Sequence, residues 1–261
     1  MTWPGLSRWD WLLASVTLGT LASLIQWALL FSLRPSDEET RPAQKHKGFV
    51  RTLLTSPWLI HPLRLLYAVG IPAAAFLWQR TLTTRGLGLQ PLPGLLTRRD
   101  TAAVWESLWR DWARDLGWTV TLTASTAALV MIGDHNARRL SAPQPTPSRN
   151  LGVALREAVY HQVHWGFYRE PFVITWGTAA GSWLGALAVL AEALLNPMVW
   201  QRVRSQGQSY VRMLVVRGGL LVTGTLLYLQ TQNLWLAIVM DAVLGWLLLP
   251  PLPLDVKRHR S

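Results

Sequence analysis

The sequence predicts an all-α protein, a polytopic transmembrane helix bundle with about seven membrane-spanning helices. Half of its 261 residues are apolar and only 15% are charged. Several apolar runs approach or exceed the ~20 residues that a helix needs to cross the hydrocarbon core of a bilayer. Many of the sixteen tryptophans stand at the edges of these runs, where an amphipathic indole prefers to lie in a membrane.

Each predicted span has its own signal. The first has no charge, and it is too long and too rich in tryptophan for a cleaved signal peptide. The second contains Pro72, which is expected to kink its helix. Pro171 is expected to end the fourth helix, and the last two spans form an antiparallel hairpin around Thr231 and Gln232. The predicted spans are residues 11–33, 58–78, 118–132, 151–169, 172–195, 211–228 and 234–249.

Two segments between the spans have a different character. Residues 100–116 place Trp105, Trp109 and Trp112 on one helical face and charged side chains elsewhere. This pattern predicts an interfacial helix on the lipid headgroups, with a helix packed against the bundle as the alternative. The Pro-rich residues 141–149 are typical of a linker. We therefore expect N-terminal spans in residues 1–140 and a four-helix unit in residues 141–261.

The charge pattern indicates orientation and partners. The net charge is +11, yet no compact polar domain presents a basic surface, which argues against nucleic-acid binding. Basic residues near the ends of membrane spans are typical of the cytoplasmic side, so the basic tail of the chain predicts a cytoplasmic C-terminus. Basic residues of three loops are expected on the same side. The basic residues of the loops and the tail are Lys45, Lys47, Arg138, Arg139, Arg149, Arg202, Arg204, Lys257, Arg258 and Arg260. We expect an integral protein of a bacterial inner (plasma) membrane, with the bilayer and other membrane-protein subunits as partners.

Ionisable side chains within the predicted spans are the candidate site, because a charge at membrane depth costs several kcal/mol by insertion scales. Glu157, His161 and His164 lie on one stripe of a helix, together with Tyr168. The other candidates are Glu192 and Asn196, one turn apart, and Asp241 in the last span. The predicted topology brings these groups to one zone in the cytoplasmic half or the middle of the membrane.

Three interpretations of this zone are open. The histidines and carboxylates could ligate zinc or iron, although their spacing matches no strong metal motif. A glutamate could activate a water molecule with histidine as the orienting donor. Alternatively, Arg217 pairs with Asp241 or Glu192 and the histidines join neighbouring helices. No particular cofactor is predicted, and the absence of cysteine excludes thiolate ligands and disulfides.

The glycines at positions 177, 181 and 185 recur every four residues in the fifth predicted span. Such a strip of small residues lets another helix approach closely, so we expect packing there.

Three segments of the C-terminal half resemble the CAAX-protease and bacteriocin-processing family of intramembrane proteases (CPBP, or Abi). Residues 227–249 are similar to the final helical hairpin of that family and read LYLQTQNLWLAIVMDAVLGWLLL. Residues 155–170, LREAVYHQVHWGFYRE, resemble its Glu-Glu-x3-Arg segment. Residues 190–197, LAEALLNP, stand where the family has Phe-x3-His. The resemblance implies a CPBP-like fold.

The motif residues themselves are largely replaced. Glu157 is retained as the second glutamate, but Arg156 and His161 stand for the first glutamate and the arginine. Glu192 and Asn196 replace the Phe-x3-His pair. Asp241 and Gly245 replace the final histidine and its asparagine partner. The resemblance therefore implies a pseudoenzyme that serves as a scaffold or an accessory subunit.

Two alternatives to the scaffold remain. One is an active membrane-embedded endopeptidase, glutamate- or metal-dependent, that combines Glu157 with a rewired set of histidines and acids. The other is a proton-coupled transporter, although no inverted repeat favours it.

Overall fold

The computed structural model of the chain is all-α, and it describes residues 6–33, 52, 56–78, 82–92, 102–138 and 150–248. By length and composition, five of the described helices could cross a membrane. They are Arg8–Ser32, Trp58–Leu77, Trp105–Gly133, Leu151–Leu195 and Gln208–Thr231. The basic loop with Lys45 and Lys47, the linker at 141–149 and the basic tail lie outside the described residues.

The chain divides into two compact units, and each combines two separate stretches of sequence. The first unit contains Met1–Gly88 and Val163–Tyr210, and the second contains Leu89–Gln162 and Val211–Ser261. This division differs from the predicted boundary near residue 140. Helix α7 (Leu151–Leu195) begins in the second unit and continues in the first.

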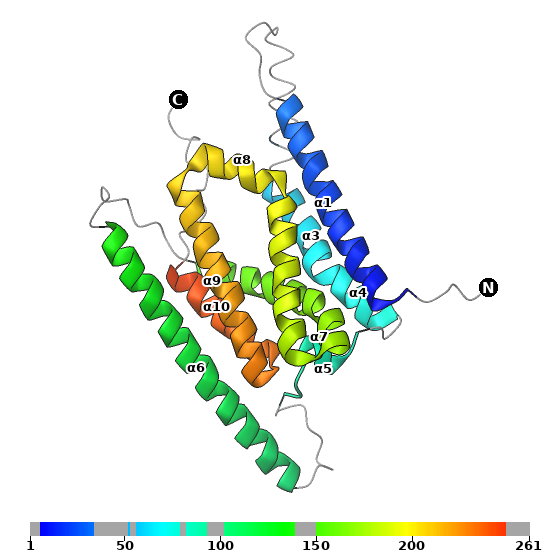
Figure 1. The fold of residues 1–261 in the computed structure, drawn as a ribbon, viewed down its shortest axis with the longest axis vertical. Coiled ribbons are helices and arrows are strands. Elements are labelled where there is room, and N and C mark those ends of the chain that lie inside the picture. Colours follow the sequence, from blue (N-terminus) through cyan, green and yellow to red (C-terminus); the bar gives the residue numbers. More distant parts are fainter. Residues whose placement is uncertain are drawn as a thin grey trace, which may run out of the picture. The chain divides into compact units, whose positions relative to one another are not determined.

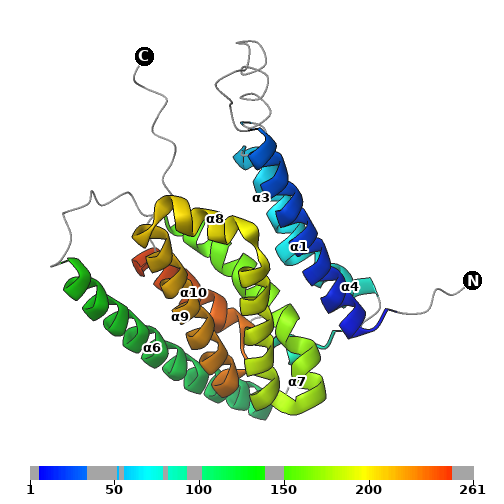
Figure 2. The ribbon, with the colours of Figure 1, turned by 45° about the horizontal axis from the view of Figure 1, so that its top comes forward.

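In the first unit, α1 (Arg8–Ser32) begins at a capping box in which Ser7 and Asp10 bind each other's backbone N–H. Ser15, Gly19 and Ser23 recur every four residues on α1, and the two serines are buried. This strip of small side chains permits close helix packing. Figures 1 and 2 both show α1 beside the segment that starts with α3 (Pro57–Leu65).

The second predicted span is one continuous helical segment with a π-helical turn inside it. It consists of α3, the π-helix η1 (Leu66–Gly70) and α4 (Ile71–Trp78). The turn ends two residues before Pro72, which has no backbone N–H to continue the regular α-helical pattern. The irregularity expected from Pro72 is thus a single widened turn, and Tyr67 lies within it.

Helix α7 folds back on itself at Gly177, where φ is 80° and ψ is 169°. A Cβ at Gly181 would meet the backbone of Phe172 and Val173, and one at Gly185 would meet Arg169 Cα. Residues on either side of Gly177 are therefore neighbours, and α7 is an antiparallel hairpin of arms 151–176 and 178–195 (Figure 1). Two helices were predicted here, but their break at Pro171 was wrong.

The physical reason for this correction is the difference between proline and glycine. Pro171 removes one backbone hydrogen bond, and the helix continues past it. Reversing the chain within one residue requires a positive φ, which glycine adopts without the steric cost of a side chain. The three glycines of the predicted packing strip therefore have two roles. Gly177 makes the turn, whereas Gly181 and Gly185 allow the opposite arm to approach closely.

The second unit is built around α10 (Leu234–Leu248), which is buried over most of its length. Helix α6 (Ala102–Arg138) packs along α10, and Thr126 of α6 contacts Thr223 of α9 (Gln208–Thr231) with 3.0 Å between hydroxyls. The tight α9–α10 turn was predicted, and Gln232 adopts a positive φ of 48° in it.

The segment predicted as an interfacial helix at residues 100–116 is not a separate helix, because α6 runs without interruption through it into the next span. Its place on the lipid headgroups stays a prediction. No proline separates the polar and apolar parts, and Glu106 and Arg110 form an i,i+4 ion pair at 2.7 Å. Two short helices were not predicted: α5 (Thr84–Leu87) and α8 (Pro197–Gln206).

Candidate functional site

Glu192 is the centre of a polar cluster in the first unit, which we call the Glu192 cluster and which also contains Tyr67, His164 and Tyr168. His164 Nε2 lies 2.9 Å from Glu192 Oε2, and the Tyr67 hydroxyl donates a hydrogen bond to Glu192 Oε1. The same hydroxyl lies 3.3 Å from the Tyr168 hydroxyl. Only 10% of the His164 side chain and 18% of the Glu192 side chain are exposed.

Three local features position these side chains. His164 and Tyr168 are one helical turn apart on the first arm of α7, with ring centroids 4.4 Å apart. The second arm returns Glu192 to the level of His164 because the hairpin turns at Gly177. Gly19 of α1 leaves the space that Tyr67 and Glu192 occupy, since a Cβ there would lie within 3.0 Å of Glu192 Oε1.

A second pair of predicted residues meets in the second unit, and we call it the Asp241 cluster. His161 Nδ1 lies 3.6 Å from Asp241 Oδ2, and the Gln162 amide donates to the same oxygen at 3.3 Å. Asp241 is buried near the middle of α10. Gly224 of α9 lies close to Gln162, which lets the amide fit against that helix.

The remaining two candidates have local partners. Glu157 accepts a hydrogen bond from the adjacent Arg156 at 3.1 Å. Asn196 is the N-cap of α8, and its side-chain oxygen accepts from the Met198 backbone N–H at 2.9 Å. The predicted residues are thus distributed over two units, with His164 and Glu192 in one and Glu157, His161 and Asp241 in the other. Asn196 serves a helix terminus.

Sequence reasoning missed Glu170, whose side chain is fully buried in the first unit. Its Oε1 accepts hydrogen bonds from Arg8 at 3.2 Å and from the Thr83 backbone N–H at 3.2 Å. These contacts join the start of α1 and the segment before α5 to the first arm of α7. The available signal was a lone carboxylate beside Pro171, between two apolar runs.

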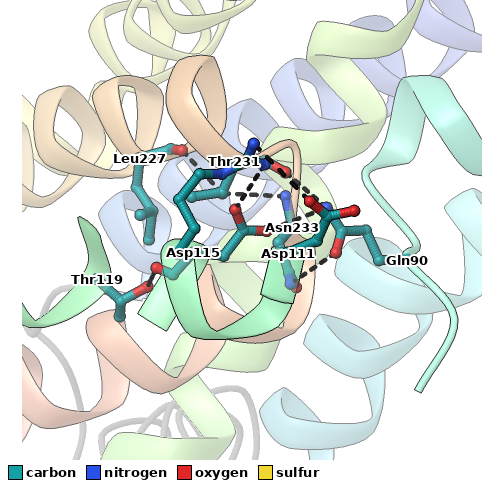
Figure 3. A network of polar contacts seen from close by, with 8 residues as sticks. Gln90, Asp111, Asp115, Thr119, Leu227, Thr231 and Asn233 are labelled. Atoms are coloured by element: carbon teal, nitrogen blue, oxygen red, sulfur yellow. Dashed lines mark hydrogen bonds and ion pairs between the residues drawn. The ribbon is translucent and has the colours of Figure 1, made fainter. Parts of the chain in front are cut away.

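Sequence reasoning also missed the polar network around Gln90 in the second unit, which Figure 3 shows. The Gln90 amide donates to Asp115 at 3.2 Å and to the Thr231 carbonyl at 2.7 Å, and it accepts from Asn233 at 3.1 Å. Asn233 also caps α10 by accepting from the Trp235 and Leu236 backbone N–H groups. This network fixes the α9–α10 turn against α6.

The chemistry of the Glu192 cluster is that of a carboxylate–imidazole pair. Such a pair could exchange a proton or hold two helices together as a charge-assisted hydrogen bond. Nδ1 of His164 is buried without a hydrogen-bond partner among the described residues. Within the part of the chain that the structure describes, no three His, Asp or Glu side chains converge as metal ligands. The metal interpretation therefore gains no support.

Comparison of the chain with protein-family models, curated proteins and solved structures gives no match. The length and composition of the chain's candidate membrane spans indicate an integral membrane protein.

Proposed function

We propose that the chain is an integral membrane protein of CPBP-like fold that no longer cuts peptides and serves as a scaffold or accessory subunit of a membrane complex. Support for the fold comes from the three similar segments at residues 155–170, 190–197 and 227–249. Support for the loss of proteolysis comes from the replaced motif residues.

The observation that carries the scaffold proposal is the closed environment of Glu192. Tyr67 and His164 engage its two oxygens, and the side chain is mostly buried. A carboxylate that activates a substrate water must direct an acceptor position toward that water. In the Glu192 cluster each carboxylate oxygen has a partner, and these contacts join η1 to α7 and the two arms of α7 to each other, which is the role of interhelical polar contacts in membrane proteins.

The proposed topology has seven crossings, with the two arms of α7 counted separately and α10 included. At 1.5 Å per residue the α7 arms are ~39 Å and ~27 Å long, near the thickness of a bilayer core. Arg8 contacts Glu170 close to the Gly177 turn, so the start of α1 and this turn share one side of the membrane. Helix α8 then lies on the other side, and its arginines support the cytoplasm as that side.

A second candidate function is an intramembrane hydrolase that uses Glu192 and His164 in place of the family's motif residues. The observation that favours it is their 2.9 Å contact together with the unpartnered, buried Nδ1 of His164. Glu157 is less suited to this role because it pairs with Arg156 on its own helix.

The experiment that separates the two functions is a cleavage assay with purified protein and prenylated or transmembrane peptides. Wild type is compared with Glu157→Gln and Glu192→Gln, and Glu106→Gln serves as control because this exposed glutamate is already paired with Arg110. The scaffold proposal predicts no cleavage above background in any variant. Cleavage that is lost in Glu192→Gln and retained in Glu106→Gln would establish the hydrolase instead.

The complementary measurement is the native mass of the chain extracted from its own membrane in mild detergent. A subunit of a complex gives a mass well above the 29.3 kDa of one chain after lipid and detergent are subtracted. A monomer in this measurement contradicts the scaffold proposal.

A further inference from the structure

Helix α8 has the character of a segment that lies at a membrane surface. It has ten residues and is ~15 Å long, too short to cross the hydrocarbon core. It joins α7 and α9, both of which belong to the candidate membrane spans. Figures 1 and 2 show it running across the end of the second arm of α7. A connection between two crossing helices lies at the membrane surface.

The two sides of α8 differ in chemistry. Val199, Trp200 and Val203 lie on one side by their i, i+1 and i+4 spacing. Arg202 and Arg204 lie on the remaining surface with Gln201 and Ser205, and both arginines are exposed. An apolar strip with tryptophan, flanked by arginines, is the pattern of a helix at the headgroup level.

The ends of α8 hold it at an angle to the preceding helix. Asn196 caps its N-terminus with an extended backbone conformation, and Pro197 follows at the first helical position. The Trp200 indole donates to the Leu194 carbonyl at 2.8 Å, which secures the helix against the last turn of α7. Trp200 nevertheless keeps 48% of its surface exposed, next to the exposed Leu194 and Leu195.

The ionisable side chains of α8 and of the sequence directly around it are all basic. No Asp or Glu occurs in the sequence between Glu192 and Asp241, whereas arginines occur at positions 202, 204, 212 and 217. The exposed Arg202 and Arg204 therefore have no carboxylate neighbour along the chain. The occupant that this surface fits is an anion on a lipid surface, because exposed apolar side chains and exposed guanidinium groups meet at the same end of α7.

We propose that α8 binds the phosphate headgroups of anionic phospholipids, with Arg202 and Arg204 as the contacting cations and Trp200 inserted beside the acyl chains. This site goes beyond the proposed scaffold function and requires only that α7 and α9 cross the membrane. Each arginine at an anionic surface contributes ~1 kcal/mol, or about fivefold in lipid preference. Both together give at most about thirtyfold.

The absence of cysteine in the chain permits a site-specific test. Ser205→Cys places one fluorescent label on α8, where the native side chain is exposed. The full-length labelled protein is reconstituted into vesicles that contain either brominated phosphatidylglycerol or brominated phosphatidylcholine in a neutral background. Bromine quenches the label only at close range, so the quenching curve reports which lipid lies beside α8.

We expect the anionic lipid to reach half-maximal quenching at a several-fold lower mole fraction than the neutral lipid. Arg202→Gln with Arg204→Gln should bring this ratio close to one, and high salt should reduce it. Arg110→Gln is the matched control, because that exposed arginine is already paired with Glu106, and it should leave the ratio unchanged.

Three outcomes overturn the proposal. The first is equal quenching by the two lipids in the protein with native arginines. The second is an anionic preference that survives the double substitution. The third is a label that neither lipid quenches, which would place α8 in water or beneath another protein subunit.

Discussion

The α7 hairpin makes a sharp prediction at Gly181, where the two arms are closest. In Gly181→Ala the new Cβ would lie 2.5 Å from the Phe172 carbonyl carbon and in contact with the Val173 backbone. Ordinary contact begins at 3.4 Å, so the arms would have to separate by about 1 Å. The obstructing atoms are backbone, and no side-chain rotation can relieve the overlap.

The cost of this separation follows from overpacking. Inserting a methyl group into a closely packed region costs about 1–3 kcal/mol. The gain in helix propensity from glycine to alanine offsets at most about 1 kcal/mol of this cost. Compared with a glycine-to-alanine change at an open helical position, which has the same gain in propensity, we therefore expect Gly181→Ala to lower the free energy of unfolding by ~1–3 kcal/mol. It should also weaken the His164–Glu192 contact, which depends on the spacing of the arms.

The assay is unfolding in SDS from mixed micelles, followed by circular dichroism. Gly218→Ala in α9 is the matched control, because nothing lies within 4 Å of its added Cβ. This variant should be at least as stable as wild type. A Gly181→Ala protein that is as stable as Gly218→Ala would refute the hairpin geometry.

Three further predictions concern the polar networks and the topology. Glu192→Gln should lower the free energy of unfolding in SDS by about 1–3 kcal/mol, because its charge-assisted hydrogen bonds become neutral ones. The exposed control Glu106→Gln should change this free energy little. Equal effects of the two substitutions would contradict the burial of the Glu192 cluster. Gln90→Ala should lower the free energy of unfolding by about 2 kcal/mol, because Asp115 and Asn233 each lose a hydrogen-bond partner. Substitution of the exposed Gln208 by alanine should leave this free energy unchanged. Single cysteines at Leu6 and Ser205, both exposed, should react with an impermeant maleimide from opposite sides of the membrane; labelling of both from one side would rule out the proposed topology.

The helical segments were largely predictable because hydropathy and length decide them. Each predicted span corresponds to a described helix or arm, and the α9–α10 turn expected around Thr231 and Gln232 lies at Gln232 and Asn233. The position of the break in α7 was harder to predict, because proline is the residue that usually ends a helix. The sequence contained the alternative signal in Gly177, which was interpreted only as part of a packing strip.

The partners of the buried carboxylates could be predicted only in part. The helical period placed His161 and His164 on one stripe with Glu157, yet it could not decide which acid each histidine contacts. That choice depends on small rotations of packed helices. His164 faces Glu192 and His161 faces Asp241, and the two pairs belong to different units. Tyr67 escaped prediction because its position depends on a π-helical turn that hydropathy does not reveal.

Three backbone features determine the surroundings of Glu192. The π-helical turn before Pro72 widens the helix at Tyr67, Gly19 gives up a side chain on α1, and Gly177 reverses α7. Together they surround one carboxylate with hydrogen-bond partners from two other segments of the fold. A charge at membrane depth is costly unless it is so enclosed. The same contacts that make Glu192 tolerable tie η1 and the two arms of α7 together, and the proposed role as a polar joint between helices rests on them.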